Sequence, residues 1–155
     1  MAPSFFVGYH TYIYTMTVIY VDMVADLFHA GHVRLLERAK ALGDTLLVGI
    51  HDDETVRSYK RTPIMSHAER CAVVGSCRYV DRVIENAPLQ VTADFLERHG
   101  IDLVVHAHSE SEDDKYAAMF RIPRELGKFR RLDYTPGIST TNILARIRGN
   151  LGEKM

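Results

Sequence analysis

Short apolar runs alternate with amphipathic helical patterns along most of this chain. The first run, residues 18–21, is continuously apolar, as expected for a strand buried on both faces of a sheet. The predicted strands are residues 18–21, 46–50, 79–84, 103–105 and 131–133, and the predicted helices are residues 32–42, 66–76, 92–99 and 139–148. Because such alternation produces right-handed βαβ units, the sequence predicts an α/β fold with a parallel sheet of about five strands and helices on both faces.

The length and composition limit the class of protein. A chain of 155 residues is long enough for one domain, and we expect an N-terminal appendage over residues 1–16 and the domain over residues 17–150. The formal net charge of -1 disfavours sequence-independent binding to nucleic acid. No apolar stretch is long enough to span a bilayer, no signal peptide is apparent, and two cysteines do not make a disulfide framework. These features predict a cytoplasmic protein.

The segment His29-Ala30-Gly31-His32 lies between the first predicted strand and the first predicted helix. The first N–H groups of a helix have no intrahelical partner, and the helix dipole adds partial positive charge there. Gly31 has no Cβ, so a phosphate can approach the backbone, and both imidazoles can donate hydrogen bonds to phosphoryl oxygens. The alternative is a pair of loop histidines satisfied by their neighbours. The strand–turn–helix context favours a polyphosphate site.

A second helix start, Gly137-Ile138-Ser139-Thr140-Thr141-Asn142, carries three hydroxyl groups. Backbone and side-chain donors together make a second anion site, whereas a simple helix cap needs only one of the hydroxyls. Lys60 lies in a loop, where it would either reach a phosphate as a flexible point charge or be a solvated surface lysine. Arg70 would add a guanidinium or be a surface charge. Two such helix starts in one small domain suit a nucleoside triphosphate.

Further polar side chains follow the predicted strands. Asp22 and Asp26 precede His29, and either would orient an imidazole or lie near a metal ion. His106 and His108 follow the fourth strand. A zinc site is an alternative, but the spacing matches no common zinc set, and two histidines without a third ligand usually hold no metal. The sequence therefore leaves metal ligands undetermined.

Many short motifs follow one another in the order found in one enzyme family. They include Tyr20-Val21-Asp22, Asp26-Leu27-Phe28-His29-Ala30-Gly31-His32, Lys60, Pro63-Ile64-Met65, Glu69-Arg70, Arg78-Tyr79-Val80-Asp81, Gly100-Ile101-Asp102 and Gly137-Ile138-Ser139-Thr140-Thr141. With these motifs, residues 17–148 resemble the H-x-G-H cytidylyltransferases, above all those acting on choline phosphate, ethanolamine phosphate and glycerol 3-phosphate. The resemblance implies a Rossmann-like nucleotidyltransferase fold, CTP and Mg²⁺ as cosubstrates, pyrophosphate as product, and a homodimer that contacts through Arg78 to Asp81. Such domains can also form the front part of a longer polypeptide.

The resemblance also implies roles for individual residues. His29, His32 and Lys60 would be catalytic. The nucleotide would be bound by Val24, Ala25, Gly31, Arg70, Gly137, Ile138, Ser139, Thr140 and Thr141, and the acceptor by Asp22, His106, Tyr116 and Tyr134.

The chain departs from the family pattern at the acceptor end. Tyr134 stands where the family has an arginine, for which Arg130 or Arg131 would substitute. The choline enzymes carry a tryptophan and an aspartate where this chain has Leu89 and Ala107, and the chain contains no tryptophan. Because a quaternary ammonium needs aromatic faces and a carboxylate, these departures disfavour choline phosphate.

A small acceptor with an uncharged tail fits the departures best. In this respect the chain is similar to the cytidylyltransferase that activates 2-hydroxyethylphosphonate in fosfomycin biosynthesis, so we expect transfer of CMP from CTP to that phosphonate. Ethanolamine phosphate or another phospho-alcohol is the alternative acceptor. The scaffold also resembles adenylyltransferases for phosphopantetheine or nicotinamide mononucleotide. In another class of function, the chain would be a catalytically silent nucleotide-binding or dimerisation module.

Overall fold

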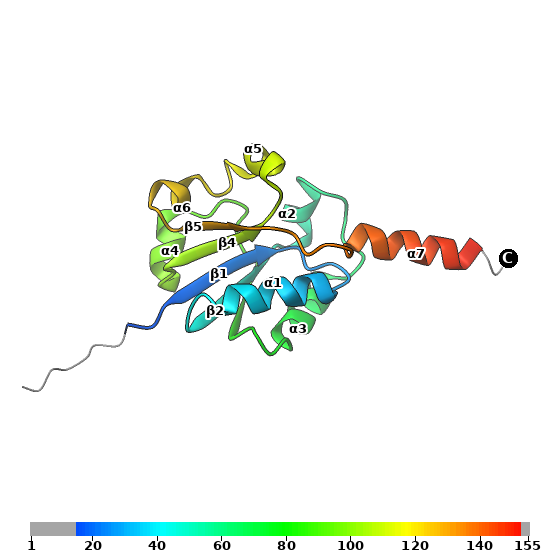
Figure 1. Ribbon diagram of the computed structural model, residues 1–155, viewed down its shortest axis with the longest axis horizontal. Helices are drawn as coiled ribbons and strands as arrows, with labels where there is room; N and C mark the ends of the chain where they lie inside the picture. The colour runs from blue at the N-terminus through cyan, green and yellow to red at the C-terminus, as the bar shows by residue number, and fades with distance from the viewer. Residues whose placement is uncertain (1–14, 153–155) are drawn as a thin grey trace, which may run out of the picture.

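A computed structural model describes residues 15–152, so residues 1–14 of the expected appendage lie outside the described residues. The fold is a five-stranded parallel sheet with helices on both faces (Figure 1). The strands are β1 (Val18–Met23), β2 (Thr45–Ile50), β3 (Arg82–Glu85), β4 (Leu103–Ala107) and β5 (Phe129–Leu132). The helices are α1 (Ala30–Lys40), α2 (Asp53–Arg57), α3 (His67–Gly75), α4 (Ala93–His99), the 3₁₀ turn η1 (Glu110–Glu112), α5 (Asp113–Tyr116), α6 (Arg121–Glu125) and α7 (Thr140–Gly152). The predicted Rossmann-like α/β class is confirmed.

The strand order β3-β2-β1-β4-β5 places the first strand at the centre of the sheet. Strand β1 pairs with β2, where Val18 lies opposite Thr45, and with β4, where Ile19 lies opposite Leu103. The direction of strand addition therefore reverses between β1 and β4. In open parallel sheets, ligands bind outside the carboxyl ends of the strands at such a reversal.

Side chains of β1 alternate between two apolar cores, one on each face of the sheet. Ile19 and Val21 pack with α1 and α3 on one face, whereas Tyr20 packs with α4 and the segment around α5 and α6 on the other (Figure 1). The helices contribute Leu36, Ala39, Cys71 and Val74 to the first core, and Phe95, Leu96 and Tyr116 to the second, which Phe120 joins from the turn between α5 and α6. Both cysteines are free thiols. The two cores hold the sheet rigid beneath the edge where its strands end.

Several element boundaries differ from the predicted ones. Strand β3 begins at Arg82 rather than at residue 79, because the backbone N–H of Val80 closes a turn onto the carbonyl of Cys77. Helix α7 continues through Gly149 to Gly152, and η1 and α5 follow β4 where no helix is among the predicted ones. The short helices α2, α5 and α6 escaped prediction because four or five residues are too few to show a helical period.

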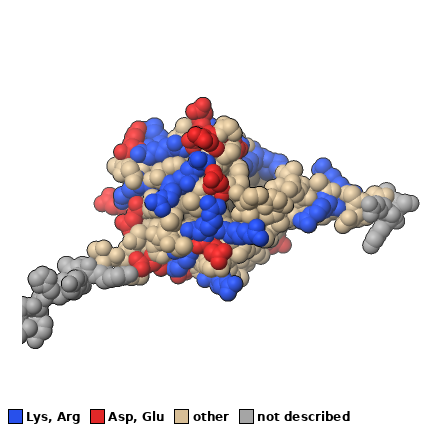
Figure 2. Space-filling view, in the orientation of Figure 1, with Lys and Arg blue, Asp and Glu red and all other residues tan. Residues whose placement is uncertain are grey.

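Helix α7 extends away from the sheet, and none of its residues is buried (Figure 1). Basic and acidic side chains are interspersed over the face drawn in Figure 2, in keeping with a net charge near zero. Among residues 15–152, no helix has the length and apolar character needed to cross a membrane.

Candidate functional site

A cavity of about 710 Å³ opens at the carboxyl edge of the sheet, beside the reversal between β1 and β4. Its size lies within the range typical of small-molecule sites. The lining residues from the two strands and the turn after β1 are Asp22, Met23, Val24, Ala25, Asp26, His29, Gly31, His32, His106 and Ala107. Lys60 and Arg61 line it from the loop after α2, Tyr116 from α5, and Tyr134 with residues 137–142 from the segment before and at the start of α7. Segments more than a hundred residues apart in the sequence therefore share one cavity.

His29 and His32 cap the start of α1 with their imidazole rings. The Nδ1 atom of His29 accepts the Gly31 backbone N–H at 3.0 Å, and Nδ1 of His32 accepts the His29 backbone N–H at 3.2 Å. A neutral imidazole whose Nδ1 accepts a hydrogen bond carries its proton on Nε2. Burial lowers the pKa of both rings, that of His32 to about 3, so both are neutral at physiological pH. Each ring thus offers one Nε2–H donor, which has no partner among the described residues.

The starts of α1 and α7 approach each other closely at Gly31. A Cβ placed on Gly31 would lie 2.8 Å from Cε1 of His29 and 3.2 Å from Cγ2 of Ile138. At the start of α7, Ser139 Oγ accepts the Asn142 backbone N–H at 3.1 Å, which is an ordinary helix cap. Two helix N-termini thus face one space, the arrangement that favours a bound anion.

The hydroxyl groups at the start of α7 have different roles. Thr140 Oγ1 donates a hydrogen bond to the carbonyl oxygen of Asp26 at 3.0 Å, which ties α7 to the turn after β1. Thr141 is exposed and lines the cavity. The simple-cap alternative therefore accounts for the hydroxyl of Ser139 but not for those of Thr140 and Thr141.

Asp22 and Lys60 are an acidic and a basic residue that both line the cavity. Asp22 is 4% exposed, and burial raises the pKa of its carboxyl to about 7, although the nearby Lys60 ammonium partly opposes that shift. Desolvation and the neighbouring Lys115 lower the pKa of Lys60. Lys60 is exposed, as the surface-lysine alternative expects, but it also lines the cavity and interacts electrostatically with Asp22.

The rings predicted to bind the acceptor gather at the same end of the cavity. The ring centroid of Tyr116 lies 4.6 Å from that of His106, and burial together with Tyr116 and Glu112 raises the pKa of Tyr134. Tyr116 and Tyr134 are the two Phe, Tyr or Trp side chains that line the cavity within the described part of the chain. Ala107 lines it where the choline enzymes have a carboxylate, and Leu89 is not among the lining residues.

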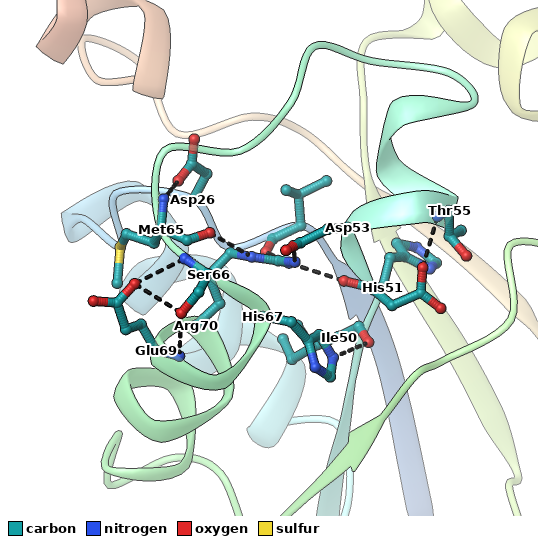
Figure 3. Close-up of polar contacts among 12 residues, drawn as sticks. Asp26, Ile50, His51, Asp53, Thr55, Met65, Ser66, His67, Glu69 and Arg70 are labelled. Carbon is teal, nitrogen blue, oxygen red and sulfur yellow. Dashed lines mark hydrogen bonds and ion pairs between the residues drawn. The ribbon is translucent and has the colours of Figure 1, made fainter.

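The prediction that Arg70 binds the nucleotide is wrong, and so is its alternative as a surface charge. Arg70 is fully buried and does not line the cavity. Its guanidinium donates to the carbonyl oxygens of Val24 (2.6 Å), His51 (2.9 Å) and Met65 (3.3 Å) and pairs with the Asp53 carboxylate at 2.5 Å (Figure 3). Because these partners occupy the guanidinium, Arg70 holds the cavity wall at Val24 in place instead of meeting a phosphate.

Within residues 15–152, the Asp26 carboxylate makes no hydrogen bond to an imidazole. Its two carboxylate oxygens accept the backbone N–H groups of Ile64 and Met65, each at 3.0 Å. Figure 3 shows the contact with Met65. Among the described residues, no group of three His, Cys, Asp or Glu side chains is arranged to hold a metal ion. Asp26 therefore fixes the loop that follows Lys60.

Two residues near the cavity escaped sequence analysis. Arg61 lines it, whereas Arg130 and Arg131, the expected substitutes for the family arginine, do not. His51 is buried at the end of β2, where its Nδ1 donates to the carbonyl oxygen of Ala87 at 3.0 Å and its Nε2 lies 3.9 Å from Asp22 Oδ2. Its position in the sequence could have indicated His51, because it directly follows a predicted strand.

Comparison with known proteins assigns this architecture to a family. A family model described as cytidylyltransferase-like matches residues 24–146. The chain is 44% identical over 138 residues to an ethanolamine-phosphate cytidylyltransferase of Arabidopsis thaliana, and 42% identical over 137 residues to one of Dictyostelium discoideum. It is 41% identical over 135 residues to choline-phosphate cytidylyltransferase A of Homo sapiens. These alignments cover 86%, 86% and 83% of this chain but only 33%, 38% and 36% of the relatives, so the chain spans about a third of their length.

Solved structures show the same fold. The crystal structure of the lipopolysaccharide core biosynthesis protein from Thermoplasma volcanium superposes with a TM-score of 0.60 at 23% identity, covering 80% of this chain and all of that one. Pantothenate synthetase from Thermus thermophilus superposes with a TM-score of 0.51 at 15% identity, covering 82% of this chain and 61% of that one.

Proposed function

Because the chain belongs to the cytidylyltransferase-like family, we propose that it transfers CMP from CTP to a small phosphate-bearing acceptor and releases pyrophosphate. One observation carries the proposal: the helix starts at residues 29–32 and 137–142 meet at one cavity, with Gly31 against Ile138. Two helix N-termini supply more backbone donors and positive potential than a single phosphate needs. A triphosphate would use the backbone donors of both helix starts.

In the proposed reaction, an acceptor phosphate oxygen attacks the α-phosphorus of CTP in line. A bond forms between that oxygen and phosphorus, the bond from phosphorus to the bridging oxygen breaks, and pyrophosphate leaves with the electron pair. The Nε2–H donors of His29 and His32 would contact the α- and β-phosphates, and Lys60 would bridge the acceptor and the α-phosphate. Catalysis would then consist of positioning and stabilisation of charge on the equatorial oxygens, without a covalent enzyme intermediate.

The nucleotide would also contact Val24, Ala25 and Gly31 along the turn after β1, and Gly137 to Thr141 would hold the departing pyrophosphate. Magnesium would enter bound to the CTP phosphates, because Mg²⁺ usually keeps several waters and takes one or two protein carboxylates beside substrate phosphates. Two buried carboxyls line the cavity, those of Asp22 and Asp26. Asp26 already binds two backbone N–H groups, so Asp22 would be the one to meet the Mg²⁺ ion. Chelation of Mg²⁺ with EDTA should abolish turnover, and added Mg²⁺ should restore it.

Ethanolamine phosphate is the proposed acceptor. The most similar relatives described above carry that substrate in their names, and a relative named for choline phosphate is nearly as similar. The cavity supports ethanolamine phosphate over choline phosphate, because two tyrosines without a tryptophan make a poor cage for a quaternary ammonium. No relative reported above is named for 2-hydroxyethylphosphonate, which remains a predicted acceptor for comparison.

The test is a pyrophosphate-release assay with CTP and four acceptors: ethanolamine phosphate, choline phosphate, glycerol 3-phosphate and 2-hydroxyethylphosphonate. We expect the highest kcat/KM with ethanolamine phosphate, and loss of activity when ATP replaces CTP. A preference for choline phosphate would refute the argument from the missing cage. Binding of CTP without product from any acceptor would overturn the proposed activity in favour of a silent nucleotide-binding module.

A homodimer through residues 78–81 is a further proposal from the family resemblance. Within one chain, the Asp81 carboxylate accepts from the Lys40 ammonium at 2.6 Å and from the Leu46 backbone N–H at 2.7 Å. Arg78 is exposed, so it is the residue of this segment best placed to reach a second copy. Sedimentation velocity of the wild type and of Arg78→Ala would test this, with a fully monomeric wild type counting against the dimer.

A further inference from the structure

A chain of hydrogen bonds runs from the cavity into the protein behind the acceptor end. His106 lines the cavity, and its Nδ1 lies 2.9 Å from Nδ1 of His108. His108 is fully buried, and its Nε2 lies 2.6 Å from Oδ1 of Asp113. Neither His108 nor Asp113 touches the cavity. The three side chains form a relay that the proposed contacts to the nucleotide do not use.

The partners of His108 fix the direction of this relay. A carboxylate only accepts hydrogen bonds, so Nε2 of His108 carries a proton. Arg124 already donates to the same Asp113 oxygen at 3.0 Å, and Arg131 donates to the His108 carbonyl oxygen at 3.2 Å. A positive charge on the buried His108 ring would leave the single Asp113 carboxylate to balance two cations, the ring and Arg124, so the ring is neutral and its Nδ1 is an acceptor. The proton between the two Nδ1 atoms therefore belongs to His106.

This assignment determines what His106 presents to the cavity. With its proton on Nδ1, the ring has a bare lone pair on Nε2. Nε2 has no hydrogen-bond partner among the described residues. It is also not among their buried side-chain atoms that lack a hydrogen bond, so it is open to the cavity. Burial and the neighbouring His108 lower the pKa of His106 to about 3, so the ring stays neutral. His106 is thus an acceptor, whereas His29 and His32 in the same cavity are donors.

We propose that His108 and Asp113 are positioning residues that hold the Nε2 lone pair of His106 toward the acceptor, and that this lone pair selects a head group able to donate a hydrogen bond. The specificity part of this inference rests on the proposed function. A primary ammonium or a hydroxyl can donate to Nε2, whereas a quaternary ammonium has no N–H to give. The Asp22 carboxyl attracts both kinds of cation, so it does not distinguish them. His106 is therefore the residue that discriminates between ethanolamine phosphate and choline phosphate.

The same lone pair argues against a different use of His106. An acceptor atom repels phosphoryl oxygens, so His106 does not bind the phosphates of either substrate. Its ring packs 4.8 Å from Phe120 and 4.6 Å from Tyr116 between centroids, which restricts rotation of the ring away from His108. The relay therefore sets both the tautomer and the orientation of the ring.

The kinetic test compares His108→Leu, His108→Asn and the control Phe129→Leu. Leucine removes the acceptor for His106, whereas the asparagine oxygen can lie near the position of the original Nδ1. Phe129 packs beside His108, at 6.3 Å between centroids, and makes no hydrogen bond in the relay, although Arg124 stacks on its ring. Phe129→Leu therefore reports the effect of altered packing around the relay while His106, His108 and Asp113 are kept. Thermal melts establish that each variant folds.

The readout is the ratio of kcat/KM for ethanolamine phosphate to that for choline phosphate. We expect His108→Leu to lower this ratio roughly tenfold, about 1.4 kcal/mol, through a higher KM for ethanolamine phosphate with an unchanged KM for CTP. His108→Asn should restore most of the ratio, and Phe129→Leu should leave it unchanged. A folded His108→Leu enzyme with the wild-type ratio, or an equal loss in Phe129→Leu, would overturn the specificity part.

A nitrogen-15 NMR spectrum of the imidazole side chains tests the relay without any turnover. The wild type should show His106 protonated on Nδ1. Asp113→Asn keeps a side chain that is partly exposed, and its amide can donate to His108 Nε2, so the His106 proton should shift at least partly to Nε2. This variant also tests the relay if His108→Leu does not fold. Protonation of wild-type His106 on Nε2 would refute the relay, whereas a wild type inactive with every acceptor would refute the proposed function and the specificity part with it.

Discussion

Replacement of Gly31 by alanine tests whether the approach of the two helix starts serves catalysis. The added Cβ would lie 2.8 Å from Cε1 and 2.9 Å from Nδ1 of His29, both too close for any side-chain contact. It would also lie 3.2 Å from Cγ2 of Ile138, so the start of α7 would shift by a few tenths of an ångström. The His29 ring is the end of a rotatable side chain, so it moves first and loses its hydrogen bond from the Gly31 backbone N–H.

The expected effects on stability and on turnover differ greatly in size. Loss of a helix N-cap costs about 0.5–2 kcal/mol, and alanine in place of a helical glycine returns about 0.5–1 kcal/mol. The net loss is about 1 kcal/mol or less, which for a protein of this size lowers the Tm by roughly 2–4 °C. Displacement of one preorganised donor from the α-phosphate should lower kcat by about 10²–10³.

Steady-state pyrophosphate release and thermal unfolding measure both quantities on the same preparation. Gly149→Ala is the matched control, because Gly149 is also helical and a Cβ there meets nothing within 4 Å. The control should keep its kcat and gain about 0.5–1 kcal/mol of stability. The reasoning fails if Gly31→Ala retains a kcat within a few-fold of wild type, since the His29 ring would then be displaced without consequence.

The remaining predictions concern His32, Arg70 and Asp22. His32→Ala should lower kcat by about 10²–10³ in the same assay, and near-normal turnover would remove His32 from the catalytic set. Arg70→Leu leaves three carbonyl oxygens without a donor and should cost about 3–5 kcal/mol in urea unfolding, whereas the exposed Arg98→Leu should cost about 1 kcal/mol or less. The pKa of Asp22 is raised to about 7 by burial, so the folded state holds the extra proton between pH 4 and 7 and this group's contribution to stability falls as the pH rises. Asp22→Asn should therefore gain stability relative to wild type over that range, by up to roughly 4 kcal/mol, and a difference that does not change with pH would contradict the raised pKa.

The sequence predicted the parts of the fold that depend on local pattern. Continuous apolar runs identified the central strands β1, β2 and β4, and the helix predicted over residues 66–76 corresponds to α3, which Ser66 and Glu69 cap. Such signals involve residues that are neighbours in sequence. Strand β3 was placed three residues early because the apolar residues Tyr79 and Val80 pack against the core from a turn and not from a strand.

Placement of the site residues was predictable because parallel strands all end at one edge of the sheet. Fifteen of the sixteen residues assigned from motifs line the cavity, with Arg70 as the exception. Its position in the first turn of α3 gave no sign that three carbonyl oxygens from separate segments surround the guanidinium. The relay through His108 and Asp113 was invisible for the same reason, since tautomers depend on partners that only the folded chain brings together.

Asp26 explains why the two helix starts can act as one site. Its carboxylate holds the backbone N–H groups of Ile64 and Met65, and its carbonyl oxygen accepts from Thr140, so three walls of the cavity meet at this residue. The flanking Ala25 and Leu27 have positive φ values of 59° and 48°, a backbone conformation that costs roughly 1–2 kcal/mol per residue. Electrostatic catalysis requires donors that are already in place when charge develops. Since α7 buries none of its residues, these few contacts at its start fix its position, and the strained turn around Asp26 is the structural cost of keeping its donors aligned with those of α1.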